Sequence, residues 1–126
     1  MRFYLDPSVD AAVGQRLTQL GHHTQSTHPD DVDASSTPEL CLWMSKSGLQ
    51  WVTADRSNID AIYDQGIAFH GTVVFIQSPE GDIADVFQRY PTLKSGRLYT
   101  LTARKTKVRQ LPTNSKPSRP TPKNAG

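Results

Sequence analysis

The feature that most constrains this chain is the regular alternation of short apolar runs with helical stripes. Apolar runs typical of buried strands cover residues 2–5, 49–53 and 72–77. Between and after them, apolar residues recur at helical spacing over 9–20, 40–47 and 83–90, and glycine or proline follows each stripe. Strands that alternate with helices predict βαβ units. We therefore expect an α/β fold with a mainly parallel central sheet.

The length and the last segment predict one domain followed by a tail. A chain of 126 residues fits a single domain with one core. Residues 97–102 and 107–111 are predicted to form a terminal strand or hairpin, so the domain covers 1–111. Residues 112–126 are basic, rich in proline and free of large apolar side chains, and we expect this tail to be disordered.

The sequence contains no signal for export or for membrane insertion. Cys41 is the only cysteine, which excludes an internal disulfide and suits a reducing compartment. No apolar run approaches the roughly 18 residues of a membrane span, and the first residues lack the apolar centre of a signal peptide. We expect a cytoplasmic protein that does not contact membranes.

The charges are divided unevenly along the chain. Residues 1–85 hold all 12 acidic residues and four of the 14 basic ones, whereas residues 86–126 hold ten basic residues and no acid. Such a division indicates contact with nucleic acid or a membrane surface. The alternative is an acidic folded body with a solubilising basic tail.

Four carboxylates are expected at one edge of the sheet. Asp6 directly follows the first strand, Asp55 comes two residues after the third, Glu39 lies in the first turn of the helix that opens at Ser36, and Asp60 lies one turn beyond Asp55. Ligands of open parallel sheets bind beyond the carboxyl ends of the strands. Carboxylates that converge there repel one another unless a cation neutralises them. Oxygen ligands suit Mg²⁺ or Mn²⁺, which can activate water against a phosphodiester.

Two of these acids also have ordinary explanations. Glu39 stands three residues after Ser36, which is the spacing of a capping box, so its role can be limited to the start of the helix. Asp60 can be a solvated residue on the surface of its helix. Asp6 and Asp55 are harder to explain in this way, because a strand end is an unfavourable place for an acid without a role.

Five segments, taken in their order and spacing, carry a resemblance to a known family. They are Arg2-Phe3-Tyr4-Leu5-Asp6, Leu20-Gly21-His22, Trp51-Val52-Thr53-Ala54-Asp55-Arg56, Gly71-Thr72-Val73-Val74-Phe75-Ile76 and Arg109-Gln110-Leu111-Pro112. Together they cover nearly the whole expected domain and resemble a compact branch of the PIN-like domain family, the DUF5615 type. This branch occurs as VapC-like toxins of bacterial toxin–antitoxin pairs.

The resemblance implies a three-layer α/β fold and a Mg²⁺-dependent (or Mn²⁺-dependent) endoribonuclease. Its catalytic and metal-binding residues would be Asp6, Glu39, Asp55 and Asp60. The substrate would be RNA, and a small cognate antitoxin would neutralise the protein. The oligomeric state, a homodimer included, stays open at this point.

The chain departs from the family pattern at two places. Relatives usually carry an acidic residue and Asn after the first Asp, where this chain has Pro7-Ser8. They usually carry Asp and Phe after the Asp-Arg pair, where this chain has Ser57-Asn58. Two expected carboxylates are therefore missing. The alternative is a catalytically degenerate PIN-like module that binds RNA or a partner protein.

A phosphoacceptor receiver domain is a weaker alternative. Its size, its strand–helix alternation and an Asp near the end of the third strand agree with this chain. Receiver domains, however, need adjacent acids after the first strand, and Asp6 stands alone. They also need a Lys-Pro pair at the fifth strand, which this chain lacks there.

Basic residues around the expected terminal hairpin form the candidate nucleic-acid surface. They would draw a polyanion toward the acidic site and release its counterions. The alternative is a solvated basic edge strand that only prevents sheet-to-sheet aggregation. The residues are Arg97, Arg104, Lys105, Lys107 and Arg109.

Overall fold

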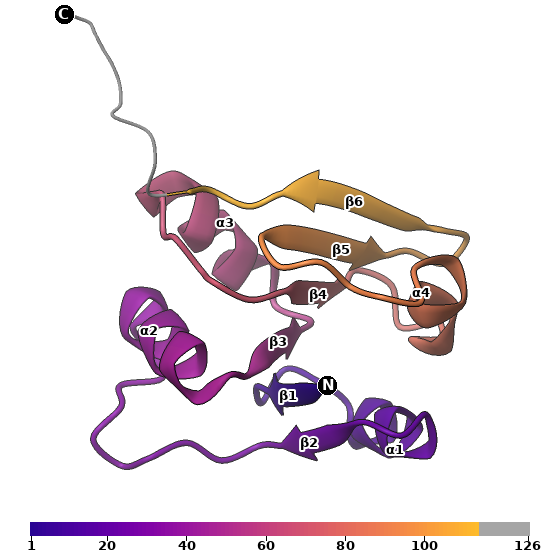
Figure 1. The fold of residues 1–126 in the computed structure, drawn as a ribbon, viewed down its shortest axis with the longest axis horizontal. Coiled ribbons are helices and arrows are strands. Elements are labelled where there is room, and N and C mark those ends of the chain that lie inside the picture. The colour runs from indigo at the N-terminus through magenta and orange to yellow at the C-terminus, as the bar shows by residue number, and fades with distance from the viewer. Residues whose placement is uncertain (114–126) are drawn as a thin grey trace, which may run out of the picture.

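The computed structural model describes residues 1–113, which form one six-stranded sheet and four helices (Figure 1). Most of the predicted disordered tail, residues 114–126, lies outside the described residues. The elements in chain order are β1 (Arg2–Leu5), α1 (Ala11–Gln19), β2 (His23–Gln25), α2 (Thr37–Ser47), β3 (Gln50–Thr53), α3 (Arg56–Gln65), β4 (Val73–Ile76), α4 (Ala84–Arg89), β5 (Arg97–Leu101) and β6 (Thr106–Gln110).

The sheet is mainly parallel, as predicted. Its strand order is β2-β1-β3-β4-β5-β6. The first five strands pair in parallel, and β6 pairs antiparallel with β5 through the turn that joins them. This order places the amino-terminal strand in the interior of the sheet, where the apolar composition of residues 2–5 suits it.

Helices cover both faces of the sheet, which gives the expected three layers (Figure 1). One core lies between the sheet and the helices α2 and α3, with Trp51 and Met44 among its fully buried side chains. The other core lies on the face of α1 and α4 and includes Phe3 and Leu17. Successive strand residues therefore serve opposite cores, which explains why β1 and β3 read as continuous apolar runs.

Helix starts and ends follow local chemistry. Asp10 caps α1 and Asp55 caps α3, in each case by accepting a backbone N–H two residues ahead. The cap of α2 is Ser36, where the sequence predicted that this helix opens, and Thr37 is the first helical residue. Gly48 ends α2 with a φ of 68°, a left-handed conformation that favours glycine.

The core extends to the end of the described chain. Leu111 is 2% exposed, packs into the core on the α3 face, and donates its backbone N–H to the Gly96 carbonyl at 2.9 Å. Among residues 1–113, no helix combines the length and the apolar character needed to cross a membrane.

Candidate functional site at the carboxyl edge of the sheet

The neighbouring strands β1 and β3 form the point where the sheet changes direction. The chain leaves β1 toward β2 on one side, whereas from β3 it continues toward β4 on the other. Ligands of open α/β sheets bind at such a switch point, outside the strand carboxyl ends. Asp6 follows β1 and Asp55 follows β3, so both predicted acids lie at this edge.

The carboxylate of Asp6 is buried and surrounded by donors. The residue is only 6% exposed. Its Oδ1 accepts hydrogen bonds from the Ser8 backbone N–H at 2.9 Å and from the Ser8 hydroxyl. Its Oδ2 accepts from Trp51 Nε1 at 3.0 Å and from Asn58 Nδ2 at 3.2 Å. A carboxylate offers about four lone-pair positions, and four donors occupy them here.

A second ring of hydrogen bonds holds these donors in place. The fully buried Thr53 accepts, at its Oγ1, from Asn58 Nδ2 and from the Asp55 backbone N–H, both at 3.1 Å. The Ser8 hydroxyl oxygen accepts from the Ala54 backbone N–H at 2.9 Å. The loop after β1 is thereby tied to the loop after β3. The Asp6 charge also raises the pKa of the Tyr4 hydroxyl, although burial is the larger cause.

Asp55 has a different environment from Asp6. It is exposed, and its Oδ1 accepts from the Ser57 backbone N–H at 2.9 Å and from the Ser57 hydroxyl at 2.7 Å. These bonds cap α3 and match the preference of helix amino termini for Asp. The capping role accounts for this acid whether or not it has a further one.

Glu39 and Asp60 do not form a cluster of carboxylates with Asp6 and Asp55. Glu39 is exposed and accepts, through Oε2, from the Asp33 backbone N–H in the loop before α2. Asp60 is exposed on α3. Within residues 1–113, no three His, Cys, Asp or Glu side chains are placed to hold a metal ion together. The catalytic and metal-binding roles of Glu39 and Asp60 remain predictions.

The donors around Asp6 do not suit a metal ion. A Mg²⁺ or Mn²⁺ ligand must direct a lone pair at the cation. At Asp6 these lone pairs face N–H and O–H groups, two of them from the Ser8 hydroxyl and the Asn58 amide. Ser8 and Asn58 are the very positions at which the chain departs from the PIN-like pattern. As the side chains stand, the residues present do not fit the metal site that the resemblance implies.

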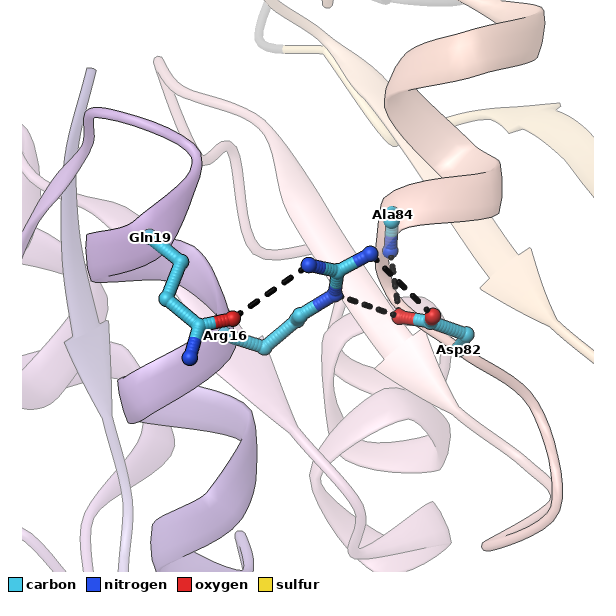
Figure 2. Close-up of polar contacts among 4 residues, drawn as sticks. All are labelled: Arg16, Gln19, Asp82 and Ala84. Carbon is cyan, nitrogen blue, oxygen red and sulfur yellow. Dashed lines mark hydrogen bonds and ion pairs between the residues drawn. The ribbon is translucent and has the colours of Figure 1, made fainter.

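A groove of about 640 Å³ runs beside the switch point on the α1 face, with Ser8 and Ala54 in its lining. Arg16 of α1 crosses to Asp82 in the loop before α4, with 3.2 Å between Nε and Oδ1, as Figure 2 shows. Asp82 also accepts from the Ala84 backbone N–H at 2.9 Å. This N–H and, less strongly, Arg16 lower the pKa of Asp82.

The structure divides the five predicted cations into two groups. Arg104 and Lys105 lie in the turn after β5, at the carboxyl edge of the sheet. Arg97 and Arg109 lie at the opposite end of the hairpin, where the Arg109 guanidinium is 3.8 Å from the ring centre of Tyr63. At about 3.4 Å per residue, Arg109 is about 14 Å along the strand from Lys105. Lys107 lies between the groups.

Sequence reasoning missed one cation of the first group. Arg89, in the last turn of α4, lines the same pocket as Arg104 and Lys105. The helical stripe of residues 83–90 predicted the helix, but it did not predict that α4 packs beside the turn after β5.

Comparisons with models of protein families, with curated proteins and with solved structures found no match. The PIN-like resemblance therefore stays a prediction.

Proposed function

We propose that the protein is an RNA-binding domain of the PIN-like type whose acidic edge does not hold a catalytic metal. The observation that carries this proposal is the complete set of donors around Asp6. In this arrangement Asp6 organises the loops after β1 and β3, and the edge that they form is a rigid platform for a ligand.

The distribution of charge supports RNA as that ligand. The acidic residues belong to the first 85 residues, whereas ten of the 14 basic ones belong to residues 86–126, which include most of α4 and all of β5 and β6. A polyanion gains affinity from cations through the release of its counterions. Arg104 and Lys105 lie at the same edge as Asp6 and Asp55, so bound RNA would run along the carboxyl ends of the strands.

A metal-dependent ribonuclease is the second candidate. It is favoured by the placement of Asp6 and Asp55 at the ends of neighbouring strands, with Asp55 exposed. Asp6, Glu39, Asp55 and Asp60 would then hold Mg²⁺ or Mn²⁺, and the partner would be a small antitoxin. This function requires the side chains of Ser8 and Asn58 to turn away from Asp6.

Binding and cleavage of labelled single-stranded RNA, measured in chelator, Mg²⁺ and Mn²⁺, separate the candidates. A binding module binds RNA in chelator as well as with either metal, with at most the weakening that divalent counterions cause at any cationic surface; it leaves the RNA intact and keeps its affinity in Asp55→Asn. A ribonuclease cleaves only with metal and loses cleavage in Asp55→Asn. Absence of both binding and cleavage would overturn both candidates.

A restoring variant provides the positive control for metal binding. Ser57→Asp together with Asn58→Phe supplies the missing carboxylate and removes the Asn58 donor from Asp6. We expect this variant to bind Mn²⁺ more tightly than the unaltered protein, because an oxygen lone pair of Asp6 becomes available. Equal Mn²⁺ affinity in the two proteins would contradict the assigned role of Asn58.

A further inference from the structure

A second site lies on the α4 face of the sheet, under the turn that joins β5 and β6. It is a pocket of about 300 Å³ between α4 and the two strands. Its lining is dominated by cations and amide or hydroxyl groups, with one acid. The lining residues are Asp85, Gln88, Arg89, Leu101, Arg104, Lys105 and Thr106.

The buried hydroxyl of Thr106 is the unusual feature of this pocket. Thr106 is 6% exposed, and within residues 1–113 its Oγ1 has no hydrogen-bond partner. A buried hydroxyl without a partner costs about 1–3 kcal/mol. Because Thr106 lines the pocket, a ligand oxygen that reached this hydroxyl from the pocket would remove that cost.

The cations of the pocket are also without partners. Among the described residues the ion pair found is Arg16–Asp82, so Arg89, Arg104 and Lys105 are not paired with a carboxylate. Asp85 stands four residues before Arg89 on the same side of α4, yet the two form no ion pair. Three cations therefore face one acid, and the pocket attracts anions.

We propose that this pocket binds a terminal phosphate group. A phosphate monoester has three non-bridging oxygens, enough to meet the Thr106 hydroxyl and the guanidinium groups together. An internal phosphodiester has only two, and a ribose on each side hinders its approach to a buried hydroxyl. The pocket therefore selects the phosphorylated end of a chain, or a free phosphate, over the backbone of RNA.

The position of the pocket links it to the proposed function, on which its use for RNA rests. Strands lie about 4.8 Å apart, so β5 is about 10 Å from β3 along the same carboxyl edge. RNA whose end occupies the pocket would lay its next nucleotides across this edge toward Asp55. The site then recognises RNA ends, such as those that a nuclease leaves.

Binding of inorganic phosphate, followed by the amide and side-chain NMR signals of residues 85–106, tests the pocket without RNA. We expect saturable binding that Thr106→Val weakens about tenfold, because a hydrogen bond to a charged group is lost. Arg104→Gln should weaken it at least as much. Lys107→Gln is the matched control: it removes a charge from the next residue, whose side chain points to the other face of the sheet, and should change little.

Thr106→Val also separates a built site from a general basic surface. It changes no charge, so attraction by charge alone would leave phosphate affinity unchanged, and that result would overturn the proposal. Arg104→Gln should in addition reduce the dependence of affinity on salt. No saturation in the unaltered protein, or signal changes spread over Lys107 and Arg109, would overturn it equally.

Oligoribonucleotides with a 5′-phosphate, a 3′-phosphate or neither distinguish the sources of the group. We expect a phosphorylated end to bind about tenfold more tightly than the unphosphorylated oligonucleotide, with the difference lost in Thr106→Val. Phosphate binding without RNA binding would uphold the pocket and overturn the proposed function. RNA binding that depends neither on a terminal phosphate nor on Thr106 would uphold the proposed function and overturn the proposed phosphate site.

Discussion

The switch point between β1 and β3 and the proposed phosphate-binding pocket beside α4 lie at the same edge of one sheet. They differ in whether their buried polar groups have hydrogen-bond partners. Around Asp6 every lone pair of the buried carboxylate meets a donor, and the donors are themselves held by Thr53 and Ala54. Around Thr106 the buried hydroxyl has no partner within residues 1–113, and the nearby cations lack ion pairs.

This difference in hydrogen bonding suggests different roles: the network around Asp6 stabilises the fold, and the pocket at Thr106 binds a ligand. A fully satisfied buried network makes the structure rigid and leaves little for a ligand to gain. A site with unmet hydrogen-bonding capacity destabilises the free protein slightly and recovers that energy when a ligand arrives. On this basis we expect the Asp6 carboxylate to serve the fold, and we expect the less conspicuous pocket to be the better candidate for recognition.

The largest expected change in the free energy of unfolding comes from Asp6→Asn. The new amide places an N–H₂ group opposite Trp51 and Asn58, or opposite Ser8, where the carboxylate accepted hydrogen bonds. We expect the free energy of unfolding in urea to fall by about 2–3 kcal/mol.

Asp55→Asn is the matched control for this substitution. It makes the same chemical change at the neighbouring strand end, but Asn caps helices as well as Asp does, so stability should change by less than about 0.5 kcal/mol. If Asp6→Asn leaves stability unchanged or increases it, the carboxylate is held under strain for chemistry, and the ribonuclease becomes the better proposal.

Thr106→Val is expected to increase the free energy of unfolding, by less than Asp6→Asn decreases it. Valine has nearly the shape of threonine and suits a strand, and it removes a hydroxyl that lacks a partner. The free energy of unfolding in urea should rise by about 1 kcal/mol, the lower end of the cost of a buried hydroxyl without a partner. Thr53→Val, which removes a hydroxyl that accepts two hydrogen bonds, should instead destabilise the protein. Loss of stability in Thr106→Val would mean that the hydroxyl already has a structural role.

The smallest effect belongs to Asp82, which joins the groove beside the switch point to the start of α4. Its pKa is lower in the folded protein, mainly because it accepts the Ala84 N–H and secondarily because Arg16 is near. The resulting stabilisation is present above the unfolded pKa of about 3.9 and is lost as the pH falls through the lower folded pKa.

Asp82→Asn should therefore lower stability near pH 7 and approach the unaltered protein as the pH falls toward 3. Both partners are about half exposed, so the difference at pH 7 should stay below about 1 kcal/mol. Urea unfolding at a series of pH values measures it. A difference that stays constant with pH would show that the contact does not depend on the charge of Asp82.

The fold could be predicted closely because its signals are local. The apolar run of residues 2–5 coincides with β1, and the helical stripe of residues 83–90 coincides with α4 to within one residue at each end. The spacing of Ser36 and Glu39 located the start of α2, which Ser36 caps. The common edge of Asp6 and Asp55 followed from the parallel sheet alone.

The details of the sites were out of reach because they depend on side-chain directions and on packing between distant segments. Ser8 and Asn58 stood out only as departures from the family pattern, and their role as donors to Asp6 appears only when the loops after β1 and β3 are brought together. The basic residues of the hairpin read as one cluster, but an extended strand separates its two ends. Arg89 joins Arg104 only through the packing of α4.

Trp51 gives the protein a built-in optical and exchange reporter. Its ring is completely buried, and its indole N–H is held by Asp6, so this proton can exchange with solvent only when the centre of the molecule opens. Trp43, which is half-buried at the border of the same core, supplies a second indole that is nearer to solvent. The hydrogen-exchange rates of the two indole N–H signals, measured in one NMR spectrum, would therefore compare the opening of the core with motion at its border, without an added probe.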